Sequence, residues 1–244
     1  VLGFLMGRGK VVSKAEAAAV NRVAFLILQP ALIFPLINGA DFSEFYFGAI
    51  ALYGLAQATI FVLTVCTAVF IFKCSALEGW LLGMATIFVN SLLYILPISS
   101  LIYGSEGNAP IKGIVIWDAA FTFAFFIITT DLLANNQGSL TGNVFRLLKN
   151  PILLFIFLGI FTNIFQITIP EPLLVAFNFV GAGAAPLTLF ALGVILSSHP
   201  LKPTKKIALF SLIKLGVLPA MVFIFLKYGH RPPIWNNMLL LNSA

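Results

Sequence analysis

Residues 83–104 narrow the architectures open to this chain, because they combine the length of a membrane span with residues that interrupt a helix. Asn90 and Ser91 lie near the middle of this apolar run, and Pro97 follows Asn90 by seven residues. A proline inside a helix removes one backbone hydrogen bond and clashes with the carbonyl four residues earlier. In lipid the freed groups need partners inside protein or beside a water-filled cavity. The segment therefore indicates either a transporter site at an interrupted helix or a kinked helix whose asparagine bonds to a neighbouring helix.

Similar apolar runs recur along the whole chain. Of its 244 residues 60% are hydrophobic and 9% charged, whereas soluble proteins have roughly 25% charged residues. About 20 apolar residues span a bilayer, so we predict an all-α integral membrane protein that is cut within a span at both ends. The predicted spans are a partial first one at the start, 23–40, 45–72, 79–104, 112–130, 151–169, 173–197, 207–226 and a ninth that begins near residue 235.

Two helix starts are marked by capping residues. Ser13 and Glu16 have the spacing of a capping box, which predicts a helix that begins near Lys14. Asn150 followed by Pro151 is a good N-cap with proline at the first helical position, and it predicts the start of the sixth span.

The basic residues indicate the orientation. The loops after predicted spans one, three, five and seven hold ten Lys and Arg residues, and the alternate loops hold three. Excess Lys and Arg mark the cytoplasmic side of a membrane. We therefore predict a multi-pass protein of the cell (inner) membrane with its N-terminus outside, and the loop charges serve topology rather than nucleic-acid binding.

Two halves of the chain resemble each other. QPALIF at 29–34 and APLTLF at 185–190 both place a proline four residues before a phenylalanine, in the second span of each half. Asn90 in the fourth span likewise corresponds to Asn242 in the ninth. Because five spans per half is an odd number, we predict inverted repeats, which in transporters meet at the binding site. The predicted domains are 1–134, a cytoplasmic linker over 135–149, and 150–244.

Two ionisable residues lie well inside predicted spans. A charge at the bilayer centre costs about 2.5–3.5 kcal/mol on insertion scales, so it usually faces a cavity or a partner. Lys214 is a candidate for binding a carboxylate, with a structural hydrogen bond that replaces a bound ion as the alternative. Asp118 is a candidate coupling residue or a structural one. The predicted substrate-binding residues are Asn90, Ser91, Pro97, Lys214 and Asn242.

The sequence lacks the usual signs of an enzyme. His199 and His230 lie in loops on opposite predicted sides of the membrane. The chain shows no metal-ligand spacing and no nucleotide-binding glycine-rich loop. We expect no catalytic residues, no metal and no cofactor.

The order of these features resembles the auxin efflux carrier family of membrane transporters, whose bacterial members include proteins described as malonate transporters. The resemblance covers essentially the whole chain. Its motifs are LGFLMGRGKVVSKAEAAAVNRVAFLILQPALIF at 2–34, Trp117-Asp118, LLKNPILLFIFLGIF at 147–161, GAGAAPLTLFALGVIL at 181–196, and Lys214 with the LPA that follows it.

The resemblance implies ten spans in two inverted five-span repeats, a scaffold of spans one, two, six and seven, and broken fourth and ninth spans that cross. Asn90 and Pro97 would fall in the first crossing helix and Asn242 in the second. The implied activity is secondary active transport of small organic anions by alternating access, with proton or ion coupling. The expected partners are the anion and the lipid bilayer, with no nucleic acid; a homodimer is one option for assembly.

Two other functions stay open. A carrier-like membrane sensor would need an attached signalling domain. A cation–proton antiporter-like exchanger would normally need acidic residues in the membrane core, where Asp118 is a candidate.

Overall fold

A computed structural model describes residues 1–104, 108–134, 150–199, 204–227 and 233–243, without the side chains of residues 127, 131, 132 and 134. These residues form helices joined by turns and loops, and none of them lies in a strand. The prediction of an all-helical, multi-pass membrane protein is confirmed at this level. Six described segments are long and apolar enough to cross a membrane: Lys14–Asn38, Phe47–Ile71, Ala76–Tyr103, Ala109–Thr130, Glu171–Ser197 and Lys205–Lys227. The ten-span count stays a prediction.

The chain divides into two compact units that each draw on both predicted halves. Unit 1 comprises Val1–Ala40, Leu92–Tyr94 and the described part of Leu148–Lys202. Unit 2 comprises the described parts of Asp41–Ser91, Ile95–Leu147 and Pro203–Ala244. Unit 1 thus contains predicted spans one, two, six and seven, the grouping that the family resemblance implies for its scaffold. The repeat boundaries at 134 and 150 are a separate matter and stay predictions, and the linker lies outside the described residues.

Unit 1 is built from α1 (Leu2–Arg8), α2 (Lys14–Val23), the π-helical turn η1 (Ala24–Leu28), α3 (Gln29–Asn38), α10 (Pro151–Ile164), α11 (Glu171–Gly181) and α12 (Ala184–Ser197). Both predicted helix starts are confirmed. The Ser13 hydroxyl accepts from Glu16 N while the Glu16 carboxylate accepts from Ser13 N. The Asn150 side chain accepts from two amides of the first turn of α10. The sixth span ends at Ile164, earlier than predicted, because the chain turns through a positive φ of 51° at Gln166.

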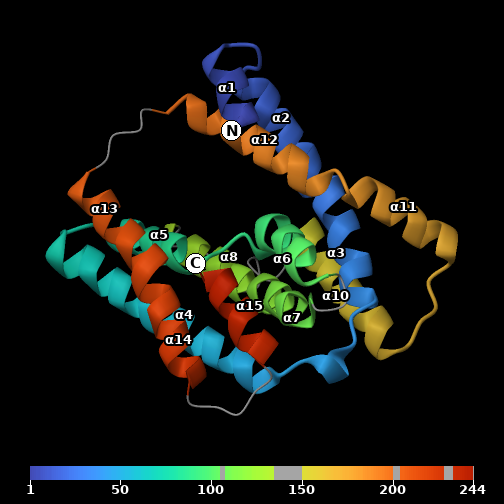
Figure 1. Ribbon diagram of the computed structural model, residues 1–244. Coiled ribbons are helices and arrows are strands. Elements are labelled where there is room, and N and C mark those ends of the chain that lie inside the picture. The colour runs from blue at the N-terminus through green and yellow to red at the C-terminus, as the bar shows by residue number, and fades with distance from the viewer. Residues whose placement is uncertain (105–107, 135–149, 200–203, 228–232, 244) are drawn as a thin grey trace. The chain divides into compact units, whose positions relative to one another are not determined.

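Small residues let the helices of unit 1 approach closely. Helix α1 packs on α12, and α3 packs on α10 and α11 (Figure 1). A Cβ at Gly181 would lie 2.8 Å from the backbone N and Cα of Leu32. The glycine of the GAGAAP motif therefore serves helix packing, as glycine does between membrane helices.

Unit 2 contains the interrupted fourth span except for Leu92–Tyr94, the middle of the π-helical turn η4 (Ser91–Ile95). Its other elements are η2 (Phe42–Glu44), α4 (Phe47–Cys66), η3 (Thr67–Ile71), α5 (Ala76–Ile87), α6 (Leu96–Tyr103), α7 (Ala109–Trp117), η6 (Asp118–Thr122), α8 (Phe123–Ala134), α13 (Lys205–Leu212), η7 (Ile213–Val217), α14 (Leu218–Lys227) and α15 (Pro233–Ser243). Helix α4 packs against α5 and α14, and α15 packs against α14 and α7 (Figure 1).

The break in the fourth span lies ahead of the position that Pro97 suggested. The backbone leaves the helix at Phe88 and resumes at Ser91, so that residues 88–90 are non-helical. Pro97 instead occupies the second position of α6, directly after the π-helical turn η4. Proline is tolerated in the first turn of an α-helix, where its missing N–H would have no partner within that helix.

Candidate functional site

The broken end of α5 exposes carbonyl groups that a continuous helix would pair. Such groups must be satisfied when they lie at membrane depth. The ammonium of Lys214 donates to the carbonyl oxygens of Ala85 (2.8 Å) and Phe88 (2.7 Å). The side-chain amide of Gln57 approaches the carbonyl oxygen of Ile87 at 3.4 Å. The break is therefore stabilised by side chains from two other spans, the third and the eighth.

Asp118 lies beside the break on the fifth span. Its side chain is buried and accepts three hydrogen bonds, from Gln57 Nε2 (3.0 Å), Ser91 Oγ (3.2 Å) and Thr122 Oγ1 (3.3 Å). Among the described residues, no lysine or arginine forms an ion pair with this carboxyl group. Neutral donors alone thus surround it in this part of the chain. Asp118 and Ser91, predicted separately, lie in direct contact.

A hydrogen bond to the carbonyl oxygen of the Gln57 side chain fixes the orientation of its amide group. The indole of Trp117 donates to Gln57 Oε1 at 3.2 Å, which leaves the Gln57 NH₂ group for Ile87 and Asp118. Room for the indole comes from Gly54, where a Cβ would lie 2.4 Å from Cζ2 of Trp117. Since Trp117 immediately precedes Asp118, one stretch of the fifth span supplies both the carboxyl group and the support of its partner.

Polar residues follow one buried face of α4. Tyr53, Gln57 and Thr64 are spaced by four and seven residues, which places them on the same side of a helix. The amide of Asn242 donates to Tyr53 Oη at 2.7 Å, and the hydroxyl of Thr86 donates to Thr64 Oγ1 at 3.2 Å. This polar face connects α15 of the ninth span to the Asp118 cluster.

Three of the predicted site residues begin or lie within π-helical turns. Ser91 opens η4, Asp118 opens η6 and Lys214 lies in η7. π-helical turns inside α-helices occur frequently at functional sites. Two further π-helical turns, η1 and η3, hold none of the predicted residues, so the association supports the site without defining it.

The structure brings the predicted residues to one region of unit 2 to different degrees. Ser91 and Asp118 touch, and Lys214 binds the broken end of α5. Asn90 is exposed in the break itself, and its carbonyl accepts from Ile95 N. Pro97 is exposed on α6, and Asn242 is fully buried and donates to Tyr53 Oη. Whether these residues bind substrate stays a prediction.

Sequence reasoning missed Gln57 and Tyr53. Gln57 contacts Ile87, Asp118 and Trp117, and Tyr53 holds Asn242. The available signal was the helical spacing of the polar residues 53, 57 and 64 within the apolar run 45–72, which places them together on one face.

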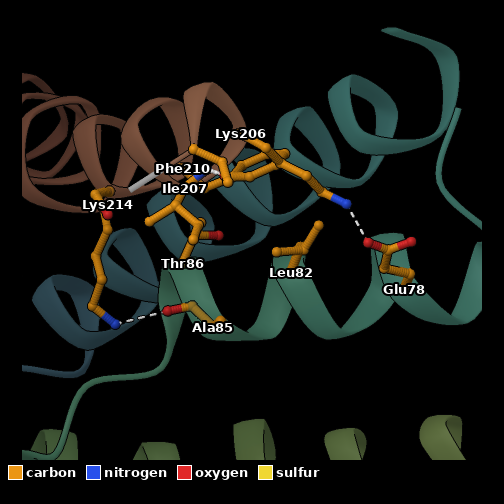
Figure 2. Close-up of a pocket in the computed structure, with 10 residues that line it drawn as sticks. Glu78, Leu82, Ala85, Thr86, Lys206, Ile207, Phe210 and Lys214 are labelled. Carbon is orange, nitrogen blue, oxygen red and sulfur yellow. Dashed lines mark hydrogen bonds and ion pairs between the residues drawn. The ribbon is translucent and has the colours of Figure 1, made fainter. Parts of the chain in front are cut away.

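A groove of about 440 Å³ runs between α5 and the eighth span. Figure 2 shows Lys214 at one end, directed toward the Ala85 carbonyl, and Lys206 at the other, paired with Glu78. Apolar side chains and hydroxyl groups line the space between: Leu82, Thr86, Thr204, Ile207, Phe210 and Ser211. Within the described ranges, no three His, Cys, Asp or Glu residues cluster as metal ligands would.

Comparison with known proteins gives one match along the full chain. No protein-family model matches it. A protein of Rhizobium meliloti (strain 1021) named "Putative malonate transporter" is 26% identical over 255 aligned positions, which cover all of this chain and 78% of that relative. The chain is therefore similar to a protein described as a transporter throughout its helical units.

Proposed function

We propose that this protein is a secondary active transporter of small organic anions, carboxylates in particular, across the cell (inner) membrane. The observation that carries the proposal is the break in the fourth span, where side chains from the third, fifth and eighth spans converge on one interrupted helix. Interrupted helices at membrane depth form the substrate and ion sites of many carriers. The full-length similarity to a protein named as a malonate transporter supports the same substrate class.

The anion would meet the break at residues 88–90. Asn90 and Ser91 lie where the second half-helix begins, and the N-terminal end of a helix favours negative charge. The single hydroxyl proton of Ser91 is donated to Asp118, so Ser91 would donate to the anion in place of that carboxyl group. Lys214 contributes positive charge at the end of α5, although two of its N–H groups already serve backbone carbonyls. Pro97 shapes the second half-helix, and Asn242 is the corresponding polar residue of the ninth span.

Asp118 is the proposed coupling residue. A buried carboxyl group without an opposite charge is costly in its ionised form. Binding a proton or a cation would remove that cost, and the hydrogen bond to Ser91 would transmit the change to the break. In the proposed cycle, alternating access would expose this cluster to each side of the membrane in turn. In the antiporter alternative, Asp118 alone would exchange protons for cations.

The proposed architecture is a pair of inverted repeats, 1–134 and 150–244, joined by a cytoplasmic linker and completed to ten spans. The predicted orientation can be tested with single cysteines at Lys73 and Lys227 in a Cys66→Ser/Cys74→Ser background. A membrane-impermeant thiol reagent applied from outside should label position 227 and spare position 73. The opposite labelling would reverse the proposed topology.

Uptake of radiolabelled carboxylates into proteoliposomes, with and without a proton gradient, tests the function. We expect saturable malonate uptake that the gradient changes, and uptake at background by Asn90→Ala. Asn178→Ala is the matched control, because Asn178 is an exposed asparagine of α11 in unit 1. Normal uptake by folded Asn90→Ala would remove Asn90 from the site. Absence of carboxylate uptake by the wild type would contradict the proposed function, and proton-driven cation flux in its place would favour the antiporter.

A further inference from the structure

Two carbonyl oxygens at the end of α5 have lost the donors that a continuous helix would supply. In an α-helix the carbonyl of Ala85 would accept from the amide of residue 89, and that of Phe88 from the amide of residue 92. The backbone is non-helical over residues 88–90, and the Phe88 amide is the last to pair within α5, with the Met84 carbonyl. Lys214 takes up both orphaned oxygens, at 2.8 and 2.7 Å.

The position held by this ammonium has the properties of a cation site. The C-terminal end of a helix carries partial negative charge, which favours a cation. In carriers with interrupted helices, the same feature, unwound carbonyls at half-helix ends, coordinates monovalent ions. Here the ammonium comes from a different span, 126 residues farther along the chain than Phe88.

We propose that Lys214 occupies a monovalent-cation site built from the Ala85 and Phe88 carbonyls, as a tethered substitute for a free ion. The two ligands are neutral oxygens, and the ammonium supplies a single positive charge, so a monovalent cation replaces it without a change in net charge. Divalent cations favour carboxylate ligands in addition. The proposal extends the proposed function, since it concerns how the broken helix is neutralised, but the binding itself requires no transport.

The groove beside α5 gives the site access to ions. Lys214 lies at one end of this open space of about 440 Å³, together with Ala85 (Figure 2). The hydroxyl groups of Thr86 and Ser211 also line it. When the lysine side chain is removed, the groove therefore gives a hydrated ion a path to the end of α5 at Ala85.

The test compares two substitutions that remove the same charge. Lys214→Ser leaves space and a hydroxyl group for an ion, whereas Lys214→Met fills the space with an apolar chain of similar length. Each purified protein is melted in NaCl, LiCl, KCl or choline chloride at equal ionic strength. We expect one of the small cations to raise the melting temperature of Lys214→Ser by about 3–6 °C over choline when present at about ten times its dissociation constant. The wild type, Lys214→Met and the control Lys227→Ser should show no such difference.

Several outcomes decide the proposal. A melting temperature of Lys214→Ser that is the same in all four salts overturns it, as does an equal cation effect on the wild type or on Lys214→Met. If Lys214→Ser does not fold, Lys214→Ala, which also leaves the space beside the two carbonyls open, replaces it under the same criterion.

A transport measurement separates this proposal from the proposed function. In proteoliposomes, carboxylate uptake by Lys214→Ser should be lost in choline and restored by the cation that stabilises it, and that cation should change wild-type uptake far less. If the wild type carries no carboxylate, the proposed function fails, and the melting experiment still decides the cation site.

Discussion

Each unit contains a helix end whose carbonyl groups accept hydrogen bonds from a side chain of another helix, and the capping side chain differs between the two units. In unit 1 the end of α3 is capped by Asn163 from α10, whose amide donates to the carbonyl oxygens of Ile37 (3.3 Å), Asn38 (2.6 Å) and Ala40 (2.8 Å). In unit 2 the end of α5 is capped by Lys214 from the eighth span. Both caps reach a helix of the first half from a helix of the second half.

The chemical difference between the caps is informative. The Asn163 amide is neutral and serves a helix that ends at a turn, between Asn38 and Ala40. Lys214 carries a charge to a break inside a span, although a charge in the membrane core is costly. A neutral amide is sufficient for structure, so the charge at the break points to function.

The largest expected effect is a loss of transport, without a loss of stability, when Asp118 in unit 2 is substituted. Asp118→Asn should reduce carboxylate uptake to background, because an amide cannot exchange a proton or hold a cation as a carboxylate does. The melting temperature should change little, since the amide still offers a hydrogen-bonding oxygen. Uptake assays on protein with a verified melting curve check this. Uptake near the wild-type level would show that Asp118 is structural and would break the contrast between the units.

The second prediction concerns helix packing in unit 1, where a substitution should lower the stability of the protein. Gly181→Ala should destabilise the protein by about 3 kcal/mol, because the new Cβ would meet the backbone of Leu32 at 2.8 Å and force α11 from α3. Gly216→Ala is the control, since the atom nearest to its Cβ is a leucine methyl at 3.6 Å. Denaturation in detergent measures both. Equal stability of the two variants would contradict the packing argument.

The third prediction concerns the neutral cap. Asn163→Ala leaves three carbonyl groups without their side-chain donor, and we expect a loss of about 2 kcal/mol in unfolding free energy. The remaining folded protein should retain the wild-type Michaelis constant for uptake. A changed cation or substrate dependence in Asn163→Ala would mean that the two caps are functionally alike.

The smallest effect is expected at the mouth of the groove. Glu78 and Lys206 form an ion pair between exposed ends of α5 and α13, and such pairs contribute little to stability. Glu78→Gln should therefore leave the melting temperature and uptake unchanged within error. A clear loss of uptake would extend the functional region from Lys214 along the whole groove.

The local features of the fold were predictable from sequence, and the long-range ones less so. Capping at Ser13 and Asn150 depends on residues within one helical turn, so spacing was sufficient. The contact of Ser91 with Asp118 joins residues of two spans, and no local pattern encodes it. Gln57 was missed because its signal, the helical spacing with Tyr53 and Thr64, is weak within a long apolar run and does not identify its partners in other spans.

The position of the break in the fourth span shows a further reason why long-range features were harder to predict than local ones. Pro97 marks a weak point in the backbone, but the chain opens at Phe88, where Lys214 and Gln57 supply donors to the carbonyls. Tertiary partners thus decide where an interrupted helix opens, and a nearby proline lowers the energetic cost of opening.

The indole of Trp117 gives the protein an optical property. It is one of three tryptophans in the chain, and a single glutamine joins it to the carboxyl group of Asp118. If Asp118 takes up an ion as proposed, a rearrangement of its carboxyl group would move the glutamine, and with it the polar surroundings of the chromophore. The emission spectrum of the native protein would then report the state of this carboxyl group, with no label attached.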